Sequence, residues 1–269
     1  MAETAPSDPA RAFALELSEL AGTERLLVAL DFDGTLSSFV DDPADARVLP
    51  KAAEAIARLE ALPDTWVAYV SGRPLESLAR VTRADDDALL IGSHGVEVRL
   101  DGGRIDLGLD ADERDRLQQL GEALQTIVDA APDSVLERKP VGYGIHTRLV
   151  EPALVHGIQG AARQAAERIG GFTVRGGKDI LEFAARDATK GDGVDRLREH
   201  LAATGVLYVG DDVTDEDGFS AMRDGDIGVK VGEGITAARF RVADPDAVGT
   251  LLTLLAGGRE QWSTGRTSR

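Results

Sequence analysis

The chain contains no cysteine among its 269 residues, which excludes disulfide bonds, zinc–thiolate sites and a thiol nucleophile. It also lacks any apolar run close to the roughly 18 residues that a membrane-spanning helix needs. The N-terminal stretch MAETAPSDPA has no basic segment followed by an apolar one, so it indicates a loose leader rather than a secretory signal. We therefore expect a cytoplasmic protein with no membrane partner.

Positive charge is scarce. The 30 lysine and arginine residues are outnumbered by 47 acidic ones, so the formal net charge is −17 and the pI is near 4.6. Such a surface repels a nucleic-acid backbone, and we expect no nucleic-acid partner. An anionic small molecule stays compatible with the sequence, because a bound cation and a few basic side chains can dominate the potential inside a cleft. Only 4% of residues are aromatic, yet the apolar fraction of 43% suits a globular core.

Apolar segments typical of strands alternate with helical patterns towards both ends of the chain. Residues 50–62 begin with a proline and repeat apolar residues at helical spacing, and a second helix is predicted from Lys190 onwards. Strands are predicted at 26–30, 65–70, 88–92, 205–210 and 226–232. The repeated strand–helix–strand order predicts an α/β fold, a Rossmann-like doubly wound parallel sheet with both faces covered.

The middle of the chain, residues 106–186, follows a different order. Its pattern predicts helices and strand pairs at 111–130, 134–139, 143–150, 152–169, 172–177 and 178–184. This αββαββ order indicates a smaller α+β domain with an antiparallel sheet, inserted into a core made of residues 1–105 plus 187–269. We interpret the last stretch, GGREQWSTGRTSR, as a mobile tail.

Four polar loops follow predicted strand ends or open a predicted helix: DFDGT, SGR, TKGDG and GDDVTDED. Ligands of parallel sheets bind at the carboxyl ends of strands, so these loops are expected to meet. In the first loop, Asp31 and Asp33 project the same way, and two close carboxylates need a cation or a lysine between them. A capping turn explains either acid alone. A calcium loop fits poorly, because aligning its glycine with Gly218 puts Val213 at the first ligand position.

The remaining loops each have an ordinary reading and a functional one. Ser71 and Arg73 form either a common turn or an anion site between a strand and a helix. Lys190 is either a surface lysine or part of the same site. The acidic loop with Asp211, Asp212 and Asp215 offers the oxygen ligands that suit magnesium together with a phosphate.

These four motifs, in this order, resemble those of the haloacid dehalogenase superfamily of aspartate-nucleophile phosphotransferases. Further segments resemble the trehalose-6-phosphate phosphatase family within it: GSHGVE, ERKPVGYGIHTR, GKDILE and the complete GDDVTDE. The first of these carries Ser93 where an asparagine is expected. The resemblance covers both the core and the insert, and it implies that the insert is a cap, or lid, that closes over a sugar.

The resemblance implies a role for each matching residue. Asp31 is expected to attack phosphorus, and Asp33 to act as general acid and then base. A magnesium ion is expected on Asp31, on the main-chain carbonyl of Asp33 and on Asp211, while Ser71 and Lys190 bind phosphate oxygens. The expected supporting residues are Gly34, Gly72, Arg73, Asp212 and Asp215.

The expected substrate-binding residues are Lys139, Arg148, Glu182, His94 and His146. Their alternative reading is ordinary solvated or packed side chains on half-exposed strands. The implied reaction is the hydrolysis of trehalose 6-phosphate to trehalose and phosphate, with a small-molecule sugar phosphate as the only expected partner. Three alternatives stay open: a phosphatase for sucrose phosphate or mannosylglycerate phosphate, a phosphomutase, and a non-catalytic sugar-phosphate sensor. The sequence leaves the oligomeric state open, a monomer included.

Overall fold

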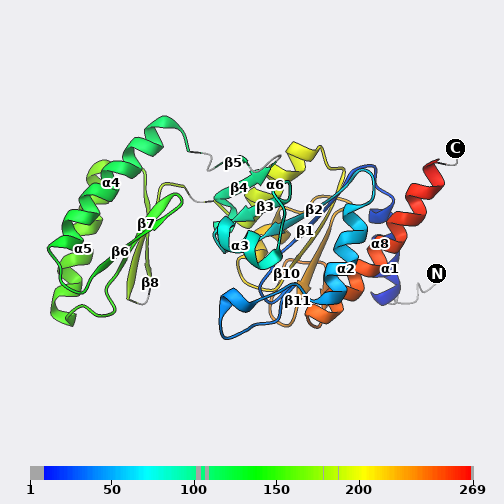
Figure 1. Cartoon of the computed structure of the whole chain (residues 1–269), viewed down its shortest axis with the longest axis horizontal. Coiled ribbons are helices and arrows are strands. Elements are labelled where there is room, and N and C mark those ends of the chain that lie inside the picture. Colours follow the sequence, from blue (N-terminus) through cyan, green and yellow to red (C-terminus); the bar gives the residue numbers. More distant parts are fainter. Residues whose placement is uncertain (1–8, 101–103, 107–108, 178, 187, 268–269) are drawn as a thin grey trace, which may run out of the picture. The chain divides into compact units, whose positions relative to one another are not determined.

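The computed structural model describes residues 9–100, 104–106, 109–177, 179–186 and 188–267. The chain divides into two compact units (Figure 1). Unit 1 comprises residues 1–105 and 188–269, and unit 2 comprises residues 106–187. Each unit has its own sheet.

Unit 1 is built on a sheet of eight strands in the order β12-β11-β10-β1-β2-β3-β4-β5. The neighbours from β12 to β3 pair in parallel, and β4 pairs antiparallel with β3. The predicted α/β fold with a mainly parallel sheet is confirmed. The strands are β1 Leu26–Leu30, β2 Thr65–Val70, β3 Leu89–Gly92, β4 Glu97–Leu100, β5 Arg104–Asp106, β10 Gly205–Gly210, β11 Ile227–Val231 and β12 Phe240–Val242.

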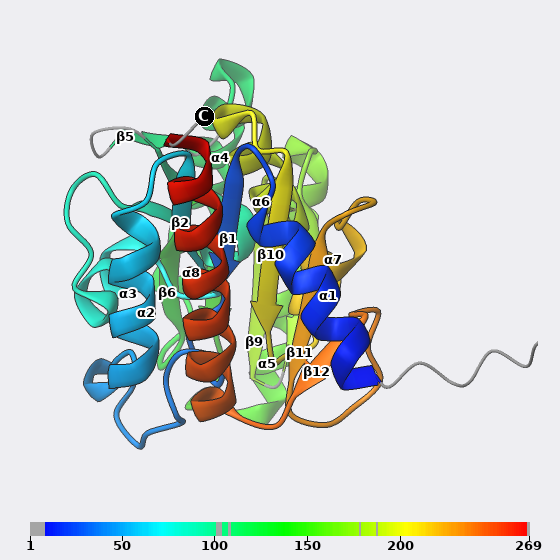
Figure 2. The same ribbon diagram turned by 90° about the vertical axis from the view of Figure 1, so that its right-hand side faces the viewer.

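The central strand β1 is apolar at every position because both faces of the sheet are covered. Leu26, Val28 and Leu30 belong to one core, shared with α1, α2, α3 and α8, while Leu27 and Ala29 belong to the other, shared with α6 and α7. Figure 2 shows α1, α2 and α8 together over one face. The helices are α1 Pro9–Ala21, α2 Pro50–Glu60, α3 Leu75–Thr82, α6 Lys190–Leu201, α7 Asp215–Ser220 and α8 Pro245–Thr267.

The register of the three central strands brings their carboxyl ends to one edge. Leu30 of β1 lies opposite Tyr69 of β2 and Val209 of β10. The loops that follow these strands therefore leave the sheet side by side, where ligands of parallel sheets bind.

Unit 2 has an antiparallel sheet in the order β6-β7-β9-β8, with α4 and α5 along one side (Figure 1). Side chains of β7 and β9 alternate, so Tyr143, Ile145, Leu181 and Phe183 are buried. Gly121 of α4 makes room for Tyr143, since a Cβ there would lie 2.2 Å from the phenol oxygen. The elements are α4 Ala111–Asp129, β6 Val135–Lys139, β7 Gly142–His146, α5 Pro152–Ile169, β8 Thr173–Gly177 and β9 Ile180–Ala184.

The strand predicted at 143–150 is wrong at its second half. The strand β7 ends at His146, and the chain then turns, with the Val150 amide donating to the Thr147 carbonyl at 3.1 Å. Pro152 begins α5, and the residue before a proline is biased away from helical geometry. The turn reverses the chain before that helix starts.

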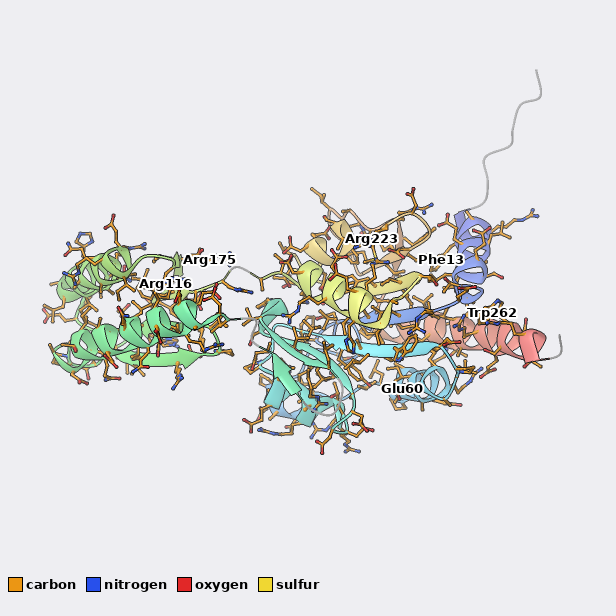
Figure 3. All side chains as sticks on the ribbon, turned by 90° about the horizontal axis from the view of Figure 1, so that it is seen from above. Phe13, Glu60, Arg116, Arg175, Arg223 and Trp262 are labelled. Atoms are coloured by element: carbon orange, nitrogen blue, oxygen red, sulfur yellow. The ribbon has the colours of Figure 1, made fainter. Side chains whose placement is uncertain are left out.

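The predicted mobile tail is also wrong, because α8 continues to Thr267. The buried side chain of Arg259 lies within this helix and donates to the carbonyls of Ala21, Glu24 and Asp64, among others. Its guanidinium also lies 4.1 Å from the ring of Trp262, which Figure 3 labels on the same helix. The helix was not predicted because this segment is rich in glycine and polar residues, and its helical structure is stabilised by tertiary contacts.

Of the leader predicted for residues 1–10, residues 1–8 lie outside the described part of the chain, and Pro9 already starts α1. Within the described ranges, no helix combines the length and apolar character that crossing a bilayer requires.

Candidate active site

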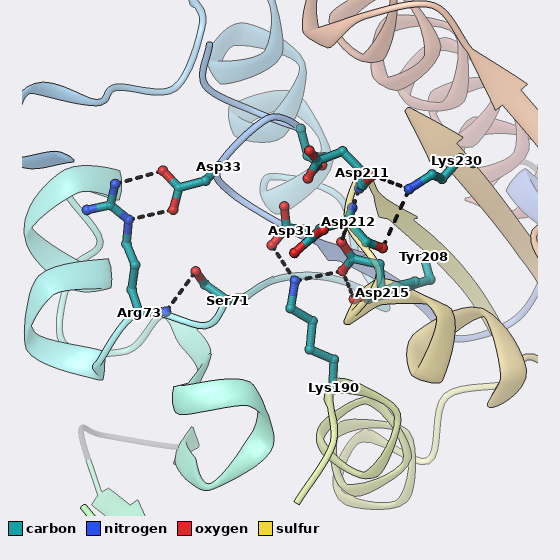
Figure 4. A network of polar contacts seen from close by, with 11 residues as sticks. Asp31, Asp33, Ser71, Arg73, Lys190, Tyr208, Asp211, Asp212, Asp215 and Lys230 are labelled. Carbon is teal, nitrogen blue, oxygen red and sulfur yellow. Dashed lines mark hydrogen bonds and ion pairs between the residues drawn. The ribbon is translucent and has the colours of Figure 1, made fainter. Parts of the chain in front are cut away.

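Three of the four predicted loops contribute to one buried cluster around Lys190. The Lys190 ammonium donates to Asp31 Oδ1 and to Asp215 Oδ1, both at 2.7 Å (Figure 4). Asp31 follows β1, Asp215 begins α7 after β10, and Lys190 begins α6. All three residues are at most 3% exposed, so the reading of Lys190 as a surface lysine is excluded.

A capping box places Lys190 at the first position of its helix. Thr189 Oγ1 accepts from the Asp192 amide, and Asp192 Oδ2 accepts from the Thr189 amide. The local sequence TKGD thus starts α6 at a defined residue, and the lysine side chain enters the cluster from there.

Burial and neighbouring charge act against each other in this cluster. Burial raises the pKa of Asp31 well above its ordinary value, and the nearby Lys190 opposes this shift. Burial lowers the pKa of Lys190, but the attraction of Asp31 and Asp215 outweighs it and leaves that pKa above its ordinary value. The ammonium therefore stays charged beside Asp31.

The Asp215 carboxylate is fully occupied by protein donors. Besides Lys190, its Oδ1 accepts from the Tyr208 hydroxyl at 2.6 Å. Its Oδ2 accepts from the main-chain amides of Asp211 and Asp212, at 3.1 and 3.0 Å. Asp215 therefore holds the acidic loop and the lysine in place, and it has little capacity left for an external ligand.

The buried Lys230 fixes the same loop from the other side. Its ammonium donates to the main-chain carbonyl of Asp211 and approaches that of Asp212 at 3.5 Å (Figure 4). With its main chain held at both sides, Asp211 directs its carboxylate towards the loop after β1, where Thr35 Oγ1 lies 3.5 Å from Asp211 Oδ1.

The donor set fits a hard divalent cation. Asp31, Asp211 and Asp215 each offer a carboxylate oxygen, all within 4.8 Å of one another. Since Asp215 is occupied by protein donors, Asp31 and Asp211 are the ones that suit an ion. Burial raises the pKa of Asp211, and the charge of Asp215 adds to this, while Lys190 and Lys230 act in the opposite direction.

Gly34 allows the close approach of the two acidic loops. Its φ is +78°, and a Cβ at this position would lie 2.2 Å from Asp211 Oδ2. A side chain is therefore excluded on both conformational and steric grounds.

Asp33 does not join the lysine cluster. Arg73 holds its carboxylate in a two-bond fork, with Nε to Oδ2 at 2.6 Å and Nη2 to Oδ1 at 2.7 Å. The guanidinium also donates to the carbonyl of Pro43 at 2.8 Å and lies 5.3 Å from the ring of Phe32. The two predicted acids therefore have different partners: Asp31 forms an ion pair with Lys190, and Asp33 forms one with Arg73.

Ser71 lies between the two ion pairs in Figure 4. It is 2% exposed, and its hydroxyl oxygen accepts from the Arg73 amide at 3.1 Å. Gly72 follows it beneath the imidazole of His94, since a Cβ there would lie 2.4 Å from His94 Cε1. The predicted substrate residue His94 therefore packs on the Ser71 loop within unit 1.

The other predicted substrate residues belong to unit 2. Lys139 forms an ion pair with Glu182, and His146 Nε2 lies 2.9 Å from Glu137 Oε2. These four side chains share the sheet face that is opposite to Tyr143 and Phe183, as the strand register shows.

Gly144 of β7 lies between Glu137 and Glu182 in register, and neighbouring side chains cover it. A Cβ at Gly144 would lie 3.2 Å from Ile180 Cδ1, 3.4 Å from Glu137 Oε2 and 3.5 Å from Lys139 Cε. Arg148 is exposed in the turn after β7. The face therefore carries charged and polar side chains, whose donors and acceptors suit a polar ligand.

Tyr208, Lys230 and Glu137 are polar partners that sequence reasoning missed. A lysine inside the apolar segment IGVKV was the available signal for Lys230, since buried charges are paired. For Tyr208 no local signal existed, because a tyrosine in a strand is typical of packing. Glu137 was visible only as part of a family motif.

A model of the trehalose-phosphatase family matches residues 29–246. The match covers well over half of the chain and includes the loops described above. The chain belongs to the trehalose-phosphatase family. The predicted resemblance is thereby confirmed.

Members of the family and other relatives match most of the chain. The trehalose-phosphate phosphatase of Mycolicibacterium paratuberculosis is 35% identical over 235 residues, covering 81% of this chain and 59% of that protein. An uncharacterized glycosyl hydrolase of Mycobacterium tuberculosis is 33% identical over 258 residues, covering 90% of this chain and 19% of that protein. The chain thus spans less than two thirds of these curated relatives. The solved trehalose-6-phosphate phosphatase of Aspergillus fumigatus matches with a TM-score of 0.69 and 26% identity, covering 95% of this chain and 99% of that one.

Proposed function

We propose that the chain hydrolyses trehalose 6-phosphate to trehalose and inorganic phosphate, with Asp31 as nucleophile. The observation that carries this proposal is the buried contact of Asp31 with Lys190, which is held in turn by Asp215. It places a carboxylate with a cationic partner at the carboxyl ends of the strands, where ligands of parallel sheets bind. Family membership supports phosphate-ester chemistry at this position.

In the proposed reaction, an Asp31 oxygen forms a bond to phosphorus while the bond from phosphorus to the sugar oxygen breaks. Asp33 supplies the proton that the departing sugar oxygen needs. The resulting phosphoaspartate is then attacked by water, which loses a proton to Asp33, and phosphate and free Asp31 are regenerated. Ser71 and Lys190 bind the phosphate oxygens as their charge is redistributed.

The Arg73 fork sets a requirement for this role of Asp33. Both carboxylate oxygens of Asp33 accept from Arg73 in the structure. To reach the sugar oxygen, the carboxylate exchanges at least one of these bonds for the substrate. The arriving phosphate favours this exchange, because it offers the guanidinium an alternative anion.

A magnesium ion is proposed on Asp31, Asp211 and the main-chain carbonyl of Asp33. When bound, it neutralises the repulsion between the phosphate and the nucleophile. Asp211 is positioned for this by Lys230 and Asp215, which hold its main chain. Asp212 supports the loop through its amide bond to Asp215.

Unit 2 is proposed to act as the cap that binds the sugar. One face of its sheet carries Lys139, Glu182, Glu137 and His146, whose donors and acceptors suit sugar hydroxyls. Arg148 adds a cation for hydroxyls or phosphate.

The cytoplasmic location stays a prediction.

The substrate assignment is tested with purified protein, magnesium and a panel of phosphate esters. Phosphate release is expected to be fastest, in kcat/KM, from trehalose 6-phosphate rather than from sucrose phosphate, mannosylglycerate phosphate or glucose 6-phosphate. A preference for another ester would contradict the assignment of trehalose 6-phosphate as substrate, but it would leave the proposed hydrolysis of a phosphate ester unchanged. Isomerised sugar phosphate without phosphate release would instead indicate a mutase, and binding without any turnover would indicate a sensor.

The nucleophile assignment is tested with Asp31→Asn and Asp33→Asn. Each is expected to lower kcat/KM by a factor on the order of a thousand or more, because each removes a group that acts in the transition state. Asp41→Asn, an exposed aspartate in the loop after β1, is the matched control and should leave activity unchanged. If both variants kept a tenth of the parent rate, the proposal would be wrong.

A further inference from the structure

Phe39 differs from the other aromatic residues of the chain. The chain has seven phenylalanines, three tyrosines and two tryptophans, and the structure describes all of them. Phe39 is the one exposed side chain among them, at 79%. The cores of unit 1 therefore do not account for its ring. Single exposed apolar residues are common on protein surfaces, so its position decides whether it has a function.

A tight turn places Phe39 over the acidic loops. The Leu36 and Ser37 amides both donate to the Phe32 carbonyl, and the Gly34 amide donates to the Ser37 carbonyl at 2.9 Å. The chain thus reverses directly after the proposed nucleophile. The ring then returns over Gly34, with its Cζ 2.8 Å from the point where a Cβ of that glycine would be.

The same point lies 2.2 Å from Asp211 Oδ2. The edge of the Phe39 ring and the proposed metal-binding carboxylate therefore flank one glycine. The exposed neighbours of Phe39 along the chain are mixed, with Val40 apolar at 45% exposure and Ser38, Asp41 and Asp42 polar. The exposed ring therefore lies beside Gly34 and the Asp211 carboxylate, in the loop that follows the proposed nucleophile Asp31.

We propose that Phe39 is a binding residue for the sugar ring that carries the phosphate. This inference rests on the proposed phosphatase function and deepens it. The C–H groups on one face of a pyranose form an apolar surface with partial positive charge, which suits the negative face of an aromatic ring. Because the ring lies next to Gly34 and Asp211, it reaches the sugar closest to phosphorus rather than a more distant one.

The experiment compares kcat/KM for two kinds of phosphate ester. Trehalose 6-phosphate and glucose 6-phosphate carry a phosphorylated pyranose, whereas glycerol 3-phosphate has no ring. Phe39→Ala is expected to lower kcat/KM about tenfold for both sugar esters, as is typical when one aromatic contact is lost, and to leave glycerol 3-phosphate unchanged. Phe39→Leu is expected to show the same loss, while Phe39→Trp, which keeps an aromatic face, retains most of the activity.

Ile235→Ala serves as the matched control, because Ile235 is an exposed apolar residue of unit 1 on a loop outside the described site. It should change neither ester class. Unfolding midpoints of all variants are measured together, and the exposure of Phe39 leads us to expect equal values.

Two outcomes would overturn the proposal. Equal losses on ring and non-ring esters would show that Phe39 acts on catalysis or on the fold rather than on the sugar. Unchanged kinetics in Phe39→Ala would show that the ring does not contact substrate. Both require an active parent enzyme. A parent that releases phosphate from none of the esters contradicts the proposed function itself, and the two failures are therefore distinguishable.

Discussion

At the scale of single residues, Lys190 decides the charge balance of the site. Its ammonium lies between two buried carboxylates, and each of these would be costly without it. Tyr208 and the backbone amides hold Asp215, so Lys190 stays close to Asp31. The lysine thus has a structural role in addition to the proposed phosphate contact.

Lys190→Met is expected to abolish activity and to lower the free energy of unfolding by about 3–5 kcal/mol near pH 8, because it leaves two buried carboxylates unpaired. The loss should shrink towards about pH 5. Without the ammonium, the pKa of Asp31 in the folded state rises further above its unfolded value, so the folded state binds more protons and gains stability as the pH falls.

Urea unfolding in EDTA at both pH values measures the effect of Lys190→Met. The exposed Lys51, which donates to Thr250 Oγ1, provides the control Lys51→Met, with a change within about 0.5 kcal/mol and no pH trend. A loss that is independent of pH would contradict the assigned electrostatic cause.

At the scale of elements, the short turn Ser93–Gly95 joins the Ser71 loop to helix α6. Ser93, His94 and Gly95 all have positive φ, at 48°, 58° and 107°. Two hydrogen bonds hold the turn. The His94 amide donates to the Ser71 carbonyl at 3.1 Å, and the Ser93 hydroxyl donates to Glu97 Oε2 at 2.6 Å. Strained backbone of this kind persists where the surroundings determine it, and it is frequent at active sites.

Gly95→Ala tests this turn. A Cβ there would lie 2.1 Å from the carbonyl oxygen of Thr189, the residue before Lys190. We expect a stability loss of about 2 kcal/mol or more and a fall in kcat/KM of at least about tenfold. Gly157→Ala in α5, where a Cβ meets nothing within 4 Å, should instead stabilise by about 0.5–1 kcal/mol with unchanged activity. Wild-type stability and activity in Gly95→Ala would show that the turn tolerates a side chain.

Helix α8 is the second element with a testable role, because Arg259 ties it to the start of the sheet. Arg259→Met would leave the carbonyls of Ala21, Glu24 and Asp64 without this donor. We expect the free energy of unfolding to fall by about 3 kcal/mol. Arg266→Met, which removes an exposed guanidinium 4.8 Å from the Trp262 ring, should change it by less than about 0.5 kcal/mol. The thermal unfolding midpoints of the two variants are compared with that of the parent. Equal midpoints for Arg259→Met and Arg266→Met would contradict the role of Arg259.

At the scale of the whole molecule, the net charge of −17 opposes the approach of the proposed anionic substrate. The described structure concentrates acids at the proposed reaction centre as well, where Asp31 and Asp211 lie close together. Phosphate binding at such a place requires a compensating cation.

EDTA is therefore expected to abolish phosphate release, and added magnesium to restore it. A readout independent of activity is thermal unfolding, since a ligand that binds only the folded state raises the midpoint. Magnesium should raise it in the parent and not in Asp211→Asn. Activity that resists the chelator would contradict the metal role of Asp211.

Much of this organisation could be predicted from the sequence. Strands such as 26–30 and 205–210 were predicted at their observed bounds, because apolar runs ending in polar loops are a local signal. The meeting of Asp31, Lys190 and Asp215 was predictable from the rule that parallel strands end at one edge. Helix α8 was missed, because its stability depends on contacts of Arg259 with residues more than two hundred positions away.

The sequence by itself determined the alternation of strands and helices, the order of the four loops and the family, since all of these are carried by local residue patterns. The tertiary structure alone decided which carboxylates are available to a ligand. Asp211 and Asp215 look alike in GDDVTDED, yet Tyr208, Lys190 and two backbone amides occupy the second. The acceptor positions of the Asp215 carboxylate are filled by donors that are distant in the sequence or that the loop itself brings close, and only folding places these donors around it.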